Sequence, residues 1–228
     1  MREAISGVDE RVSRARLLQE QALSDGDAGL LADAGRELDA AEADLAVTRG
    51  RLLHGQFLLR RDQDPAGAEA DPGQLPLLER AARLYEALGD TRGQADALFW
   101  IGCFHQLARR DHATAVTVFE RSLELSAQAG DKAVMAEALR HLGIVAHAGG
   151  DLAAARRRLE ESTRLRREAG LLAGVAANMV GLAYIAAAQG RADEALALIS
   201  EGSAIARACQ ADRIAAQLSE AGARIGGQ

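Results

Sequence analysis

The sequence predicts an all-α fold, a solenoid of about five antiparallel helical hairpins. Turn-forming residues recur at a nearly constant period: Gly89, Gly130 and Gly170 lie 41 and then 40 residues apart, and Gln210 follows 40 residues later. Between these turns the same residue types return at helical spacing. The three prolines all lie before residue 77, so helices can run with little interruption through the remaining chain. A fixed period of this length is typical of stacked helical hairpins.

Each repeat is predicted to contain two helices, in which columns of large and small residues alternate. The large columns form an apolar stripe, and the small columns let two helix backbones approach to about 8–10 Å. In the first helix the large columns are Leu98, Leu139, Met179 and Ile101, Leu142, Leu182, and the small column is Gly102, Gly143, Ala183. In the second helix the small columns are Ala115, Ala155, Ala195 and Ser122, Ser162, Gly202.

The predicted turns use the residues that helix ends require. Gly150-Asp151 is placed between the two helices of a hairpin, and Gly130-Asp131 is placed between hairpins. Glycine ends a helix in the left-handed conformation, and the following aspartate caps the next helix. The first repeat contains one extra residue, which we place at Arg109-Arg110-Asp111.

Four segments are predicted along the chain. Residues 1–61 form irregular N-terminal helices, expected over 3–23 and 28–61, with Gly35 or Gly50 as a candidate kink. Residues 62–73 form an acidic loop that contains proline and glycine. Residues 74–210 form the repeat array, beginning with a helix over 74–88, and residues 211–228 form a capping helix and tail.

Composition disfavours several classes of function. The net charge of −6 gives no general attraction for nucleic acid or anionic membrane, and no apolar run reaches the roughly 20 residues of a membrane span. The charged start of the chain lacks the apolar core of a signal peptide, so we expect a cytoplasmic protein, and the preference for arginine over lysine suggests a bacterial one. The arginine-rich stretch is the best nucleic-acid candidate, but interleaved glutamates favour a solvated, salt-bridged face. Its members are Arg156, Arg157, Arg158, Arg164, Arg166 and Arg167.

No catalytic, metal or cofactor motif is found. His141 and His147 share a helix but are six residues apart, whereas a zinc-binding pair needs a spacing of three or four. Cys103 and His105 are two residues apart on a helix and therefore cannot form a nucleophile–base pair. We expect a protein that is not an enzyme and that takes no cofactor or metal.

The repeat resembles the tetratricopeptide repeat. The residues that carry the resemblance are Leu139, Leu142-Gly143, Gly150-Asp151, Ala155, Leu159 and Ser162, and the match spans about Gln74 to Gly202. The repeat unit is about 40 residues, whereas the family's is about 34, and the family's terminal proline is missing. Both departures are similar to the longer repeats in the regulatory arms of bacterial maltose-regulator-type activators. The resemblance implies a right-handed α-α superhelix that binds a protein or peptide in its concave groove.

The resemblance also implies which residues line this groove. In each first helix they lie three residues before, one residue after and four residues after the small-column position, which is Gly102, Gly143 or Ala183. These positions are Phe99, Cys103 and Gln106, then Arg140, Ile144 and His147, then Val180 and Tyr184, with Trp100, His105 and His141 at the border. Arg140 is the leading candidate, because a guanidinium can hold a carboxylate through two hydrogen bonds. The alternative is that Arg140 pairs with Glu137 or another acid within the stack, and Trp100 is better explained by repeat packing.

Three classes of function remain open from the sequence. The first is an interaction module for a protein or peptide, the second is a ligand-sensing regulatory module without its own DNA-binding domain, and the third is an enzyme or enzyme accessory with a pocket in the superhelix. Self-association through the irregular N-terminal helices is a further alternative. Nucleic acid and membrane are not expected as partners.

Overall fold

The structure is a computed structural model that describes residues 9–227, and these residues form ten α-helices and one π-helical turn, with no strand among them. Residues 3–8 of the N-terminal helix predicted over 3–23 lie outside the described residues; among the described residues, α1 begins at Glu10 and ends at Asp25. The elements are α1 (Glu10–Asp25), α2 (Ala28–Gln63), α3 (Gln74–Leu88), α4 (Thr91–Phe104), the π-helical turn (His105–Arg109), α5 (His112–Gln128), α6 (Lys132–Ala148), α7 (Leu152–Glu168), α8 (Leu172–Ala188), α9 (Ala192–Ala208) and α10 (Asp212–Gly226). The all-α prediction is confirmed, and ten helices agree with about five hairpins.

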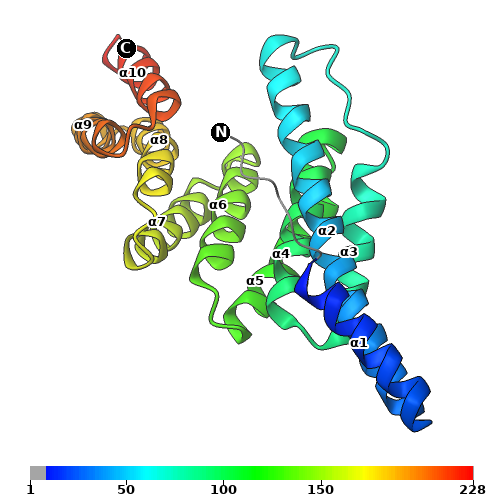
Figure 1. The fold of residues 1–228 in the computed structure, drawn as a ribbon. Coiled ribbons are helices and arrows are strands. Elements are labelled where there is room, and N and C mark those ends of the chain that lie inside the picture. The colour runs from blue at the N-terminus through cyan, green and yellow to red at the C-terminus, as the bar shows by residue number, and fades with distance from the viewer. Residues whose placement is uncertain (1–8, 228) are drawn as a thin grey trace, which may run out of the picture. The chain divides into compact units, whose positions relative to one another are not determined.

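The chain divides into two compact units, one ending at Arg109 and one beginning at Arg110. In the first unit, α2 packs against both α1 and α3, and α3 packs against α4 (Figure 1). The long α2 helix continues without a break through Gly35 and Gly50, the two positions considered as kinks. Gly50 has a packing role instead: a Cβ atom built there would lie 2.4 Å from Leu78 Cδ2, so α2 and α3 approach closely at this point.

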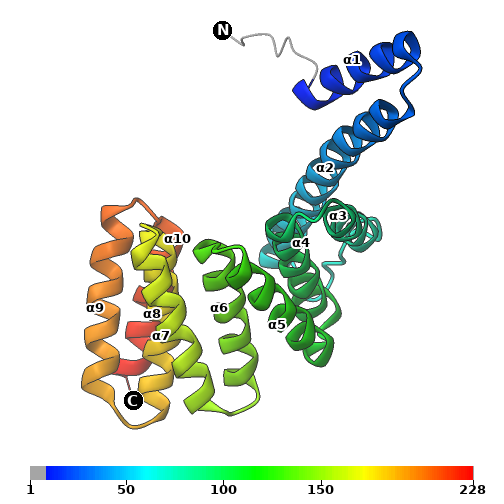
Figure 2. The ribbon, with the colours of Figure 1, turned by 90° about the horizontal axis from the view of Figure 1, so that it is seen from below.

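The second unit contains the regular part of the repeat array. Figure 2 shows α6, α7, α8 and α9 side by side, and each packs against the next. The last helix, α10, packs against both α8 and α9 through the buried residues Leu218 and Ala221. In this unit the first helix of one repeat lies beside the first helix of the next repeat, as α6 lies beside α8. Because α10 contacts α8 as well as α9, it takes the position of the next first helix.

The turns are formed as the sequence predicts. Gly130 and Gly150 have φ values of 69° and 82°, which most L side chains avoid, and they end their helices in the left-handed conformation. Asp131 and Asp151 then accept hydrogen bonds from the first backbone N–H groups of α6 and α7. Gln210 occupies the position equivalent to these glycines and has a φ of 56°, so the period continues there without a glycine.

The extra residue of the first repeat lies earlier than the sequence suggested. It is absorbed in the π-helical turn His105–Arg109 at the end of α4, rather than in the turn at Arg109-Arg110-Asp111. A π-helical turn closes each hydrogen bond across one more residue than an α-helix, and so it accommodates an insertion without breaking the helix. Arg110 then takes the left-handed turn conformation, with a φ of 55°.

A buried polar network fixes three helices of the second unit to one another. Asn178 on α8 donates to Ser162 Oγ (2.9 Å) and Thr163 Oγ1 (3.1 Å) on α7. Ser162 donates in turn to the carbonyl oxygen of Ala136 on α6 at 2.6 Å. Because a hydroxyl needs little space, the small column at Ser162 both permits the close crossing and connects α6 to α8. The network sets the positions of the helices that carry the candidate site.

Candidate functional site

A cleft of about 310 Å³ opens in the second unit between α6, α8 and α10. Four of the predicted groove residues meet in it: Arg140 and Ile144 from α6, and Val180 and Tyr184 from α8. Its other lining residues are Leu159, Ala177, Gly181, Gln217 and Glu220. The volume is at the lower end of the range for ligand sites, so it fits one or two side chains of a bound peptide.

Helical periodicity explains which side chains reach this cleft. Asn178 is fully buried in the polar network, and Val180 follows two residues later, about 200° around the same helix. Val180 therefore faces away from α7, toward the cleft. Gly181 lies above Leu159: a Cβ atom built at Gly181 would lie 2.9 Å from Leu159 Cδ1. This close approach makes an apolar floor for the cleft.

The cleft has opposite charges on its two sides. Arg140 lies on α6 and Glu220 on α10, and both of these helices pack against α8. Glu220 forms an ion pair with Arg224 one turn later on α10, at 2.6 Å. Between the charges lie the apolar side chains of Ile144, Val180 and Tyr184. This arrangement suits a segment that offers an acidic group to α6 and apolar groups to α8.

Glu137, one of the acids considered as a partner for Arg140, pairs with Arg166, and Arg140 itself also takes part in an interaction within the structure. Glu137 Oε1 lies 2.7 Å from Nη2 of Arg166, a buried arginine of α7. Burial lowers the pKa of Arg166, Glu137 opposes this shift, and the positive charge of Arg140 adds to the lowering. Arg140 therefore lies near a second guanidinium, whose positive charge is balanced by its ion pair with Glu137.

The other predicted groove residues lie elsewhere. Phe99, Cys103 and Gln106 belong to the first unit and are buried, so their side chains offer little surface to a ligand. Burial follows from their neighbours: Phe99, for example, lies with its ring edge-on to Trp100. His147 is exposed at the end of α6 and does not line the cleft. A binding role for these four residues stays a prediction.

The three border residues are half-buried and take part in packing within their own units. Trp100 donates from Nε1 to Asp96 Oδ1 (3.2 Å), and its ring contacts His54 at 5.5 Å between centroids. The His141 ring lies 5.2 Å from that of Phe119, and His105 lies 5.8 Å from Phe104. These contacts support the packing interpretation of Trp100.

Five lining residues of the cleft were not predicted as site residues, and two of them, Gln217 and Glu220, come from α10. The sequence pattern identifies α10 only as a capping helix. The 40-residue period contains the signal: Glu220 lies 40 residues after Val180, which itself lies 40 after Arg140. Extending the predicted groove positions by one more period places Glu220 among them, together with Arg140 and Val180.

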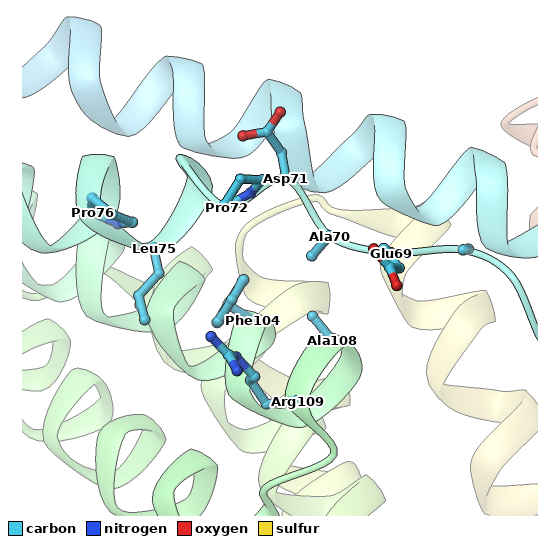
Figure 3. Close-up of a pocket in the computed structure, with 10 residues that line it drawn as sticks. Glu69, Ala70, Asp71, Pro72, Leu75, Pro76, Phe104, Ala108 and Arg109 are labelled. Atoms are coloured by element: carbon cyan, nitrogen blue, oxygen red, sulfur yellow. The ribbon is translucent and has the colours of Figure 1, made fainter.

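A second, larger cavity of about 460 Å³ lies in the first unit (Figure 3). The loop before α3 covers it, and the π-helical turn forms the opposite wall. The guanidinium of Arg109 lies 5.6 Å from the centre of the Phe104 ring, a cation–π distance. The loop is held by Asp71, which accepts from the Gly73 N–H, and by Arg60, which donates to the Glu69 carbonyl. The sequence pattern predicts only a solvated loop over residues 62–73 and gives no sign of this cavity.

The arginine-rich stretch on α7 is extensively paired with glutamates. Arg156 binds Glu194 (2.6 Å) and Glu160 (2.7 Å), Arg164 binds Glu161 (2.6 Å), and Arg167 binds Glu201 (2.7 Å). These pairs support the salt-bridged interpretation of the stretch.

Within residues 9–227, no group of three or more His, Cys, Asp or Glu side chains could hold a metal ion. None of the described helices is long and apolar enough to cross a membrane.

The repeats match a known family. The tetratricopeptide repeat family model matches residues 94–168. These residues form tetratricopeptide repeats. Such repeats are generally modules for protein–protein interaction, and they are typically not catalytic. No curated protein matches the chain.

Two solved structures are similar to the chain. One is the crystal structure of nearly identical TPR-like repeats of a putative kinesin light chain from Podosopora anserina, with 18% sequence identity and a TM-score of 0.51. The match covers 78% of this chain and 89% of that one, and it shows a shared tetratricopeptide-like fold. The other is BtubC (BKLC) from P. vanneervenii, with 17% identity, a TM-score of 0.46, and coverage of 88% of this chain and 90% of that one.

Proposed function

We propose that the chain is a non-enzymatic interaction module that binds an extended segment of a protein partner in the cleft between α6, α8 and α10. The observation that carries the proposal is that four groove residues, Arg140, Ile144, Val180 and Tyr184, line one cleft. Arg140 would hold an acidic group of the partner, and Val180 and Tyr184 would contact an apolar side chain next to it.

The charge of the cleft decides the chemistry of the segment. A carboxylate near Arg140 gains charge-assisted hydrogen bonds from the guanidinium. Glu220 on the opposite side would repel a second acid and favour a basic or neutral group. The preferred segment therefore has an acidic residue, then an apolar residue, and no acid near α10.

Affinity capture from the native lysate tests this proposal. We expect the Arg140→Ala change to weaken binding of the captured protein by about tenfold, because one charge-assisted contact in a partly desolvated cleft is lost. Arg157→Ala is the matched control, since this exposed arginine lies on α7 and does not line the cleft. If Arg157→Ala weakens capture and Arg140→Ala does not, the proposed cleft is wrong.

A ligand-sensing module is the second candidate, favoured by the 460 Å³ cavity with Arg109 placed over Phe104. A small molecule that raises the melting temperature of the chain in the absence of any protein partner would favour this function over the first. Loss of that shift in Arg109→Ala, with the shift kept in Arg140→Ala, would place the ligand in the first unit.

A further inference from the structure

The long helix α2 has a row of exposed leucines at a strict seven-residue spacing. Leu31, Leu38, Leu45, Leu52 and Leu59 are each between 47% and 61% exposed. We call these five residues the leucine stripe. At 1.5 Å per residue, the stripe spans about 42 Å of a helix about 54 Å long. A seven-residue apolar repeat sustained over this length is the pattern of a helix that pairs with another helix in a coiled coil.

The stripe lies opposite the face that α2 uses within the first unit. The buried residues of α2 include Ala43, Gly50 and Phe57, each two residues before a leucine of the stripe. Two residues correspond to about 200° around a helix. The contacts of α2 with α1 and α3 therefore leave the stripe on the outer side. Packing within the first unit does not account for a regular apolar face at this place.

The charges along α2 indicate which helix fits this face. Residues 28–45 contain five acids and one arginine, whereas residues 46–63 contain four arginines and one acid. Asp39 and Glu42 border the stripe in the first half, and Arg49 and Arg60 border it in the second. Glu42 pairs with Arg80, but both side chains are about half exposed, so this ion pair is easily exchanged. Asp39 also acts electrostatically on Arg80, and Arg49 is exposed.

We propose that α2 pairs antiparallel with α2 of a second copy of this chain, through the leucine stripe. Leu45 lies near the middle of α2, so a two-fold axis there keeps all five leucines within the seam. The leucines of the two copies then alternate along the seam, and each acidic half meets the basic half of the other copy. Parallel pairing would instead place Glu42 against Glu42 and Arg49 against Arg49.

This pairing uses the first unit and does not depend on the cleft in the second unit. A dimer would present two copies of the cleft to a partner, which raises the apparent affinity for a partner with two binding segments. Dimer formation and partner binding by the cleft can therefore be tested independently of each other.

The molar mass of the whole chain, measured by analytical ultracentrifugation from about 1 to 100 µM, tests self-association. We expect a dimer that dissociates on dilution, and at least a tenfold weaker dimer for Leu45→Glu. Leu196→Glu is the matched control, because this leucine of α9 is 45% exposed and lies outside the stripe. A chain that is monomeric at all these concentrations overturns the proposal. Equal association of the Leu45→Glu and Leu196→Glu variants also overturns it. A chain that stays monomeric and binds a different protein through the leucine stripe overturns it as well.

The direction of pairing is tested by a spin label on Ala32→Cys in a Cys209→Ser background, since Cys103 is buried and Cys209 is exposed. Ala32 is exposed beside Leu31, near one end of the stripe. Antiparallel pairing predicts about 40 Å between the two labels, from the helical rise. Parallel pairing predicts a distance near the spacing of packed helices, about 10 Å. The short distance would contradict the antiparallel arrangement.

Discussion

Replacing Arg166 with alanine is expected to lower the free energy of unfolding by about 3 kcal/mol. The Arg166 side chain is buried, with the whole residue 2% exposed, and it makes two polar contacts. Nη1 donates to the Gly174 carbonyl of α8 at 2.6 Å, and Nη2 pairs with Glu137 of α6 at 2.7 Å. Alanine would leave the Gly174 carbonyl without this donor and would open a cavity between three helices. Chemical denaturation measures the change.

Two further variants separate the causes of this loss. Arg166→Met keeps an apolar stem of similar length but removes both polar contacts, so we expect it to recover the part that is due to packing. Arg167→Ala is the matched control: its partner Glu201 and Arg167 itself are both about half exposed, so the change should cost less than about 1 kcal/mol. Equal losses for Arg166→Ala and Arg167→Ala would contradict the role given to the buried pair.

Acidification from pH 6.5 to pH 4 is expected to destabilise the first unit by about 3 kcal/mol through His54. The His54 ring is buried on α2, with its Nδ1 3.0 Å from the side-chain amide of Gln74. Burial, and then the positive charge of Arg61, lower the pKa of His54 from 6.5 to about 4. Between these pH values the unfolded chain binds a proton that the folded chain does not. Stability is therefore present above pH 6.5 and is lost as the pH falls toward 4.

The comparison of variants isolates this contribution from that of the carboxylates. His54→Gln removes the titrating group, so its unfolding free energy should fall less between pH 6.5 and 4 than that of the wild type. His112→Gln is the control, because this histidine is exposed at the start of α5. If His54→Gln follows the pH dependence of the wild type, His54 is not the group responsible.

Much of the fold could be predicted from the sequence because its local rules repeat. A glycine and a capping aspartate at a constant period predict where α6 and α7 begin. The predicted close approach at Gly143 is present: a Cβ atom built there would lie 3.1 Å from Leu159 Cγ. The helix over 74–88 begins and ends as the sequence predicts.

The sequence was less informative where the local rules are broken. Nothing in a one-residue insertion says whether a turn or a helix will absorb it, and the structure places it in the π-helical turn. The cavity beneath the loop before α3 forms between residues 68–76 and residues 104–109, which are far apart in the sequence and which no local pattern connects.

The candidate site was predicted in part. The periodic positions found Arg140, Ile144, Val180 and Tyr184, which line one cleft. The same rule also selected Phe99, Cys103 and Gln106, which are buried. Spacing gives the face of a helix, but it does not say whether neighbouring side chains cover that face. Glu220 was missed because the period was not extended into α10.

The most direct test of the central claim is a photo-crosslink from the cleft. A benzophenone-bearing phenylalanine analogue at Tyr184 replaces one aromatic side chain with another, and the same group at Arg157 reports on the exposed face of α7. If the cleft binds the partner, the Tyr184 position forms a covalent adduct with a protein, Arg140→Glu suppresses that adduct, and the Arg157 position forms none. An adduct from Arg157 alone, or one from Tyr184 that is unchanged by Arg140→Glu, would contradict the account.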